Sequence, residues 1–173
     1  GRVEHDEVGD RAVADHAAVA QLEPGRRRRG HLANRLLEAQ ERLIAHELAE
    51  LRRRGVEVRV VSLRQPGVEL RHEFIARAGL DAATSYDPRE FAAVLREFRP
   101  QLLHAHFATE PAAAARDLAA QLGLPFTFTA HGYDIRRKAP ADFAARAAAA
   151  RAVVTVSQAN ARHIVETFGV PVV

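Results

Sequence analysis

The sequence predicts an α/β fold, a Rossmann-like three-layer sandwich built on a mostly parallel sheet. From about residue 40 onward, helical patterns alternate with short runs rich in β-branched residues. Because parallel strands are joined by crossover connections, this alternation demands a parallel sheet covered by helices. The 173 residues suffice for one domain with a substantial core and are too few for two full domains.

The first predicted elements begin with a helix that has an apolar face at helical spacing. Cations in its last turn and Gly55 after it favour a helix C-terminus there. Asp87 and Pro88 supply a cap and a first-turn proline for the next helix, which Pro100 ends. Residues 64–86 carry no readable pattern. The elements predicted in this half are a helix at 43–54, a strand at 56–63 and a helix at 87–99.

The second half of the chain repeats the alternation more regularly. Gly123 stops one helix, Pro140 opens an alanine-rich one and Ser157 caps a third. The last residues, 170–173, resemble a turn into a further strand. The predicted strands lie at 101–106, 125–130 and 152–156, and the predicted helices at 111–122, after 140 and at 158–168.

Composition excludes several classes of function. The chain has no Cys, which rules out disulfides, thiolate zinc sites, iron–sulfur clusters and cysteine nucleophiles. No run approaches the roughly 18 apolar residues of a membrane span, and no signal-peptide pattern is present. Four arginines at 26–29 are interpreted as solvated charge at a domain edge, because no aromatic residue is interleaved for base stacking. We therefore expect no nucleic-acid partner.

Polar residues gather where the predicted strands end. In open parallel sheets ligands bind outside the carboxyl ends of the strands, because strand-to-helix loops converge there. We expect Ser157 to cap its helix, a role compatible with phosphate binding at a helix N-terminus, and Asn160 to lie on exposed surface. The residues at these ends are His104, His106, Phe107, Thr129, His131, Gly132, Tyr133, Asp134, Ser157 and Asn160.

A metal interpretation and a structural one compete for the first histidine pair. His104 and His106 lie two residues apart on a strand, so their side chains share one face, as a metal-binding pair requires. No acidic third ligand is evident at matching spacing, and Glu110 is the nearest acid. A structural role is therefore favoured.

The segment from His131 to Asp134 is the stronger signal. A histidine directly after a buried strand lies on a loop where it can act as acid, base or hydrogen-bond donor, and Gly132 lets a ligand approach the backbone. Asp134 is either a helix cap or an acceptor for sugar hydroxyls, and Tyr133 is a packed lid residue. The alternative is that Gly132 permits a turn and His131 caps a helix.

Four ordered motifs carry a resemblance to a known family. Each falls at a predicted strand end or helix boundary, and together they resemble the N-terminal domain of glycosyltransferase family 4 over about residues 41–173. The most similar types are colanic-acid and exopolysaccharide enzymes. The motifs are Leu102–Phe107 (LLHAHF), Leu122–Ile135 (LGLPFTFTAHGYDI), Val154–Ser157 (VTVS) and Phe168–Pro171 (FGVP).

The resemblance implies half of a two-domain enzyme. Such enzymes have the GT-B architecture, in which two Rossmann-like domains face each other across a cleft, and the C-terminal domain, absent here, holds the nucleotide-sugar. His131 would be the catalytic residue at the cleft, touching the donor sugar or its phosphates. The residues implied to bind substrate are His106, Gly132, Tyr133, Asp134 and Ser157. Transfer would be retaining, with no metal and no cofactor besides the nucleotide-sugar donor.

The chain departs from the family pattern at its beginning. The family begins with an apolar first strand, but this chain has four arginines at 26–29 at the corresponding position. Burying their charge in a central strand without partners would be costly. We therefore expect a first strand that is shortened and shifted, or damaged. Good matches in this region are Asn34, Arg35, Glu41 and Ile44, with Glu41 favouring the helix dipole. We expect 1–24 to be a leader or poorly ordered segment and 25–173 to be an incomplete acceptor-side domain.

The functional expectation follows from the resemblance. The parent enzyme would move a sugar from a nucleotide-sugar to a glycan or lipid-linked acceptor in cell-surface polysaccharide synthesis, and this fragment alone would be inactive. We expect a cytoplasmic bacterial protein, with peripheral association at the inner membrane face left open. Two alternatives remain: a non-catalytic carbohydrate- or phosphate-binding module, and a metal-dependent hydrolase fragment using His104, His106 and His131.

Overall fold

The computed structural model describes residues 27–33, 42–64 and 76–173, and it confirms the Rossmann-like α/β fold. Its strands form one six-stranded sheet in the order β3-β2-β1-β4-β5-β6, and every pair in it is parallel. This order is typical of doubly wound sheets, in which successive strands are added outward in both directions from the centre. The expected leader at 1–24 and Glu41 lie outside the described residues.

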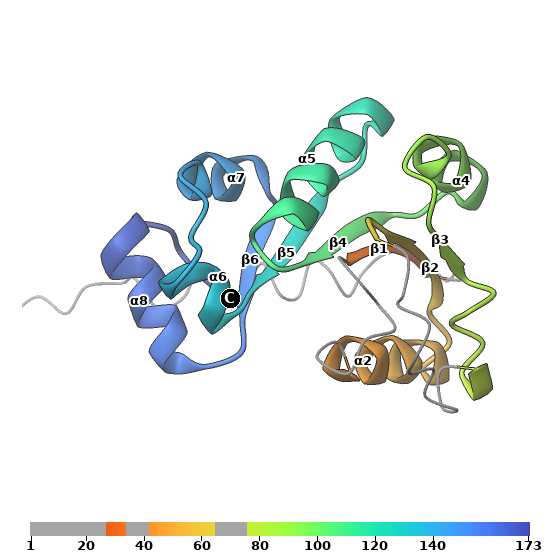
Figure 1. Ribbon diagram of the computed structural model, residues 1–173, viewed down its shortest axis with the longest axis horizontal. Coiled ribbons are helices and arrows are strands. Elements are labelled where there is room, and N and C mark those ends of the chain that lie inside the picture. Colours follow the sequence, from red (N-terminus) through yellow and green to blue (C-terminus); the bar gives the residue numbers. More distant parts are fainter. Residues whose placement is uncertain (1–26, 34–41, 65–75) are drawn as a thin grey trace, which may run out of the picture.

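Helices cover both faces of this sheet. In Figure 1, α4, α5 and α7 lie on one side, α2 lies on the other, and α8 lies beyond β6. The strands are β1 (Arg28–Ala33), β2 (Glu57–Ser62), β3 (Thr84–Ser85), β4 (Leu102–His106), β5 (Phe126–Ala130) and β6 (Ala152–Thr155). The helices are α2 (Arg42–Arg53), α4 (Phe91–Phe98), α5 (Glu110–Leu122), α6 (Gly132–Arg136), α7 (Phe143–Ala149) and α8 (Gln158–Phe168). Among these described helices, none is both long enough and apolar enough to cross a bilayer.

Two apolar clusters fill the space between the layers. The larger one joins the sheet to α4, α5, α7 and α8, and it is built on alternate residues of the central strands, among them Leu32, Leu103, Ala105 and Phe128. The smaller one lies under α2 and consists of Ile44, Ala45, Leu48, Val58, Val60 and Leu80. Because strand side chains alternate between faces, the α2 face also receives His31, His104 and His106.

The first strand is complete and central, so the expectation of a shortened, shifted or damaged strand is wrong. Six residues of β1 pair with β2, and four pair with β4. The charge is accommodated because Arg28 lies at the amino end of the strand, where its guanidinium remains partly exposed. It pairs with Glu57 at 2.8 Å and donates to the Phe98 carbonyl at 3.1 Å.

Three local differences from the sequence predictions have simple physical reasons. Strand β3 lies in the stretch that carries no readable pattern, because two residues are too few to show a period. Helix α6 has five residues, again too short for an amphipathic repeat. The predicted final strand at 170–173 is not formed as a strand, although the Val173 N–H donates to the Val153 carbonyl at 2.9 Å.

Gly30 is required by close packing rather than by its backbone conformation. A Cβ atom there would meet Leu103 Cδ2 at 2.6 Å and Leu95 Cδ2 at 3.0 Å. Both leucines are fully buried, so neither has free space into which it can retreat. We predict that Gly30→Ala lowers the free energy of unfolding by about 1–3 kcal/mol through overpacking, measured by urea denaturation.

A matched glycine supplies the control for that experiment. A Cβ on Gly132 would lie no closer than 3.8 Å to the nearest side chain, that of Asn160, so Gly132→Ala should change stability little. Equal effects of the two substitutions would contradict the assignment of Gly30 to close packing.

Candidate functional site at the carboxyl edge of the sheet

The topology selects one edge of the sheet. Strands β1 and β4 are neighbours, and the described helices that follow them in the chain, α2 and α5, lie on opposite sides of the sheet (Figure 1). A crevice forms at such a switch point, outside the carboxyl ends of the strands. Here the ends of β4 and β5 supply His106, Phe107 and His131. The predicted site residues therefore lie at the edge that the fold itself favours.

His131 and Asp134 build the turn between β5 and α6 together. They form a capping box, in which the His131 side chain accepts the backbone N–H of Asp134 and the Asp134 carboxylate accepts the backbone N–H of His131. The second of these bonds is 2.6 Å long. Reciprocal capping of this kind satisfies two amides that a helix start leaves without intrahelical partners. His131 thus caps α6, as the alternative interpretation holds, and the cap fixes the orientation of the imidazole. Its predicted role as the catalytic residue stays a prediction.

Asp134 also joins two loops that are far apart in the sequence. Its second carboxylate oxygen accepts the backbone N–H of Ala108, just after β4. The side chain is fully buried, and burial raises the pKa of its carboxyl to about 6, partly offset by the backbone hydrogen bonds. Both oxygens are therefore engaged by backbone donors, as the cap interpretation predicts. Its predicted contact with substrate stays a prediction.

The His131 ring is held on several sides but keeps one nitrogen without a partner. The Phe107 ring lies against it with centroids 4.5 Å apart, and the His106 ring lies 6.2 Å away. Burial lowers the pKa of His131, which favours the neutral imidazole. Since Nδ1 is the ring nitrogen that can accept the Asp134 N–H, the proton of the neutral ring lies on Nε2. That Nε2 is buried and has no hydrogen-bond partner among the described residues.

Phe107 has the kind of backbone conformation that often marks a functional site. Its φ of 76° lies in the left-handed region, which is a genuine outlier for a bulky residue. Its N–H donates to the Thr129 carbonyl at 2.9 Å, so the strained residue is fixed between the two loops. Sequence reasoning placed Phe107 at a strand end but missed its role as the wall behind His131, because a positive φ at phenylalanine leaves no signal in the sequence.

The next loop brings Ser157 and Asn160 to the same edge. Ser157 caps α8, and its hydroxyl accepts the Asn160 N–H at 3.2 Å, as predicted. The expectation that Asn160 is exposed is wrong, because it is buried and its amide faces Gly132. Gly132 does not have a positive φ and has room for a Cβ, so the fold alone does not require glycine here. Tyr133 is 60% exposed, so the description of it as a packed lid residue does not fit this chain in isolation.

Three buried histidines extend from this edge under α2. His31, His104 and His106 lie on one face, with the His104 and His106 rings 4.8 Å apart and the His31 and His106 rings stacked at 6.0 Å. His104 is fully satisfied by the Thr127 and Thr129 hydroxyls at 2.7 and 3.0 Å. This confirms a structural role for it. Both nitrogens of His31 and of His106, by contrast, are buried without partners in the part of the chain that the structure describes.

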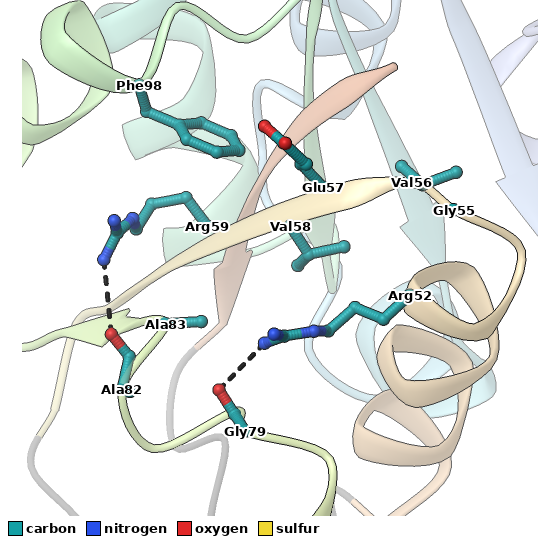
Figure 2. A pocket seen from close by; sticks show the side chains of 10 residues that line it. All are labelled: Arg52, Gly55, Val56, Glu57, Val58, Arg59, Gly79, Ala82, Ala83 and Phe98. Atoms are coloured by element: carbon teal, nitrogen blue, oxygen red, sulfur yellow. Dashed lines mark hydrogen bonds between the residues drawn. The ribbon is translucent and has the colours of Figure 1, made fainter. Parts of the chain in front are cut away.

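A separate pocket of about 470 Å³ opens at the amino ends of β2 and β3. Figure 2 shows Arg52 and Arg59 reaching across it toward the segment that precedes β3. Arg52 donates to the Gly79 carbonyl at 2.8 Å and Arg59 to the Ala82 carbonyl at 3.3 Å. These contacts fasten β3 to the sheet, and the pocket lies at the end opposite to the strand ends that bind ligands in this fold. We therefore assign it a structural role.

Comparison with known proteins agrees with this geometry. The sequence model for Glycosyltransferase Family 4 matches residues 40–173, which include the whole carboxyl-edge site. The chain belongs to glycosyltransferase family 4. A search of curated protein sequences finds no match.

Solved structures support the fold of this family member. A UDP-N-acetylglucosamine 2-epimerase from Listeria monocytogenes, described as putative, matches with a TM-score of 0.57 at 10% identity, over 82% of this chain and 42% of that one. The UDP-GlcNAc 2-epimerase from Methanocaldococcus jannaschii matches with a TM-score of 0.50 at 8% identity, over 81% and 42%. A third UDP-N-acetylglucosamine 2-epimerase matches with a TM-score of 0.53 at 10% identity, over 82% of this chain and 46% of that one. The chain thus spans less than half the length of these proteins, and at such identities the likeness shows the fold alone.

The buried carboxyl of Asp134 predicts a specific pH dependence. Between about pH 4 and 6 the folded protein keeps a proton that the unfolded chain has released. The stability from this group is therefore present below pH 4 and is lost as the pH rises through 6. Compared with Asp134→Asn, the wild type should gain about 2 kcal/mol at pH 4 relative to pH 7, because a rise of about two pKa units is only partly expressed so close to the ordinary pKa of 3.8.

Urea unfolding of both proteins at the two pH values measures this difference. Groups that behave alike in both proteins cancel in this comparison, so a wild-type-minus-variant difference that stays constant with pH would contradict a raised pKa at Asp134.

Proposed function

We propose that this domain is the acceptor-side half of an enzyme that transfers a sugar from a nucleotide-sugar to a glycan or lipid-linked acceptor. The observation that carries the proposal is the Nε2 of His131 at the carboxyl edge of the sheet, which is buried and has no hydrogen-bond partner among the described residues. A buried N–H donor without an acceptor costs free energy. This donor lies beside the strained Phe107 and beside Gly132, which leaves room for a ligand. We infer that a bound ligand supplies the missing acceptor. Membership of glycosyltransferase family 4 supplies the class of ligand.

In this proposal His131 meets the charge that develops on the leaving group. The bond between the anomeric carbon and the oxygen of the nucleoside diphosphate breaks. The acceptor oxygen forms the new bond on the same face of the sugar, and the acceptor's hydroxyl proton passes to the leaving diphosphate. The neutral Nε2–H donates a hydrogen bond to the leaving oxygen or to the sugar, and its orientation is fixed beforehand by the capping box. Catalysis in this scheme needs no metal.

The other predicted residues take supporting roles in the same proposal. His106 and Gly132 border the space next to His131, and Ser157 begins α8 at the neighbouring strand end. The 60% exposed Tyr133 is placed to contact substrate from the rim. We further propose that the product belongs to a cell-surface polysaccharide of the colanic-acid or exopolysaccharide type, made in the cytoplasm at the inner face of the membrane.

The test compares this chain alone with the chain joined to a donor-binding domain, as the proposal expects for the whole enzyme. With a panel of nucleotide-sugars, the 173-residue chain alone should release no nucleoside diphosphate, whereas the enzyme with its donor-binding domain should turn over. In that enzyme His131→Ala should lower kcat by about 100-fold or more, since the loss of one preorganised donor costs about that much. His131→Gln keeps an N–H donor and should retain more activity.

His46→Ala is the matched control, because His46 is an exposed histidine on α2 and not part of the β5–α6 turn that carries His131. Three results would count against the proposal: unchanged kcat in His131→Ala, turnover by the isolated chain, and loss of activity on chelation of metal. The last would favour the metal-dependent hydrolase alternative.

A further inference from the structure

The fold brings an acidic side chain next to His104 and His106, although the sequence places none close to them at a suitable spacing. Glu47 on α2 lies across from His106, with Oε2 at 3.9 Å from Nε2. One ligand atom from each of Glu47, His104 and His106 falls within 4.8 Å of the other two. Two imidazoles and a carboxylate are the ligand types of zinc sites with three protein ligands.

The protonation and hydrogen bonding of the His104 and His106 rings are compatible with binding a cation. His106 is about 1% exposed, and neither of its nitrogens has a partner among the residues described, so its lone pair is unused. His104 is oriented by the Thr127 hydroxyl, which lies 2.7 Å from Nδ1. The other ring nitrogen of His104, Nε2, lies 3.0 Å from the Thr129 hydroxyl. With the proton on Nδ1, this Nε2 can bind a cation in place of that hydrogen bond once the Thr129 hydroxyl rotates away.

The remaining adjustment is small. Zinc ligand bonds are about 2.0–2.2 Å long, so the three atoms need to approach one another by about an ångström. Glu47 can move toward the two rings, because its side chain is 51% exposed. The histidines are fixed by their strand, and the half-exposed carboxylate is the adaptable partner.

We propose that Glu47, His104 and His106 form a binding site for Zn²⁺ or a similar divalent transition metal, with a water completing the coordination. The proposal does not depend on sugar transfer, and the cation takes no part in that reaction.

Titration of the 173-residue chain with Zn²⁺ alone, followed by isothermal calorimetry in a non-chelating buffer at pH 7.5, tests the site. We expect one ion per chain, with affinity lowered at least about tenfold by Glu47→Gln and by His106→Ala. Bound Co²⁺ should give the visible absorption typical of a four-coordinate ion. This absorption should be lost in Glu47→Gln and in His106→Ala.

Matched controls separate this site from other histidines and acids. Glu50→Gln, one turn along α2, removes a carboxylate that pairs with Arg53 and Arg54, and His163→Ala removes a histidine on α8; both should bind like the wild type. Glu47→Gln changes a half-exposed side chain and should fold normally, so the test stands even if His106→Ala does not fold. Absence of stoichiometric binding, or binding that is equal in Glu47→Gln and Glu50→Gln, would overturn the proposal.

Discussion

The carboxylate of Asp134 is the constraint on which the site depends. It is fully buried and accepts backbone N–H groups from two loops, at Ala108 after β4 and at His131 after β5. Burying a carboxyl is costly unless such donors are present, and here they offset part of the rise in its pKa. The same two bonds fix the distance between the strand ends and the direction of the His131 ring.

The rest of the carboxyl edge is arranged around these two hydrogen bonds to the Asp134 carboxylate. Phe107 is held in a left-handed conformation between the same loops, and its ring limits the positions open to His131. The capping box determines which nitrogen carries the proton. In the proposed transfer, a donor that is preorganised in this way costs no reorganisation when charge develops on the leaving group.

Much of the fold was predictable because its signals are local. Strand alternation placed His104 and His106 on one face, and cap and glycine signals located most helix ends. The sequence did not predict a complete β1, because the partners of Arg28 cannot be read from it. Arg28 lies at the amino end of this central strand, where it bonds to Glu57 and to the Phe98 carbonyl. Glu47 was missed as a neighbour of His106 because only the packing of α2 on the sheet brings them together. Asn160 was misplaced because its burial depends on α8 lying against Gly132, which is a tertiary contact.

Amide hydrogen exchange measures the central tie most directly. In the wild type the N–H groups of Ala108 and His131 should both be protected, and Asp134→Ala should expose both together while the Phe107 N–H, bonded to the Thr129 carbonyl, stays slow. Independent behaviour of the two amides, or protection that persists in the variant, would contradict the claim that one buried carboxylate positions both loops of the site.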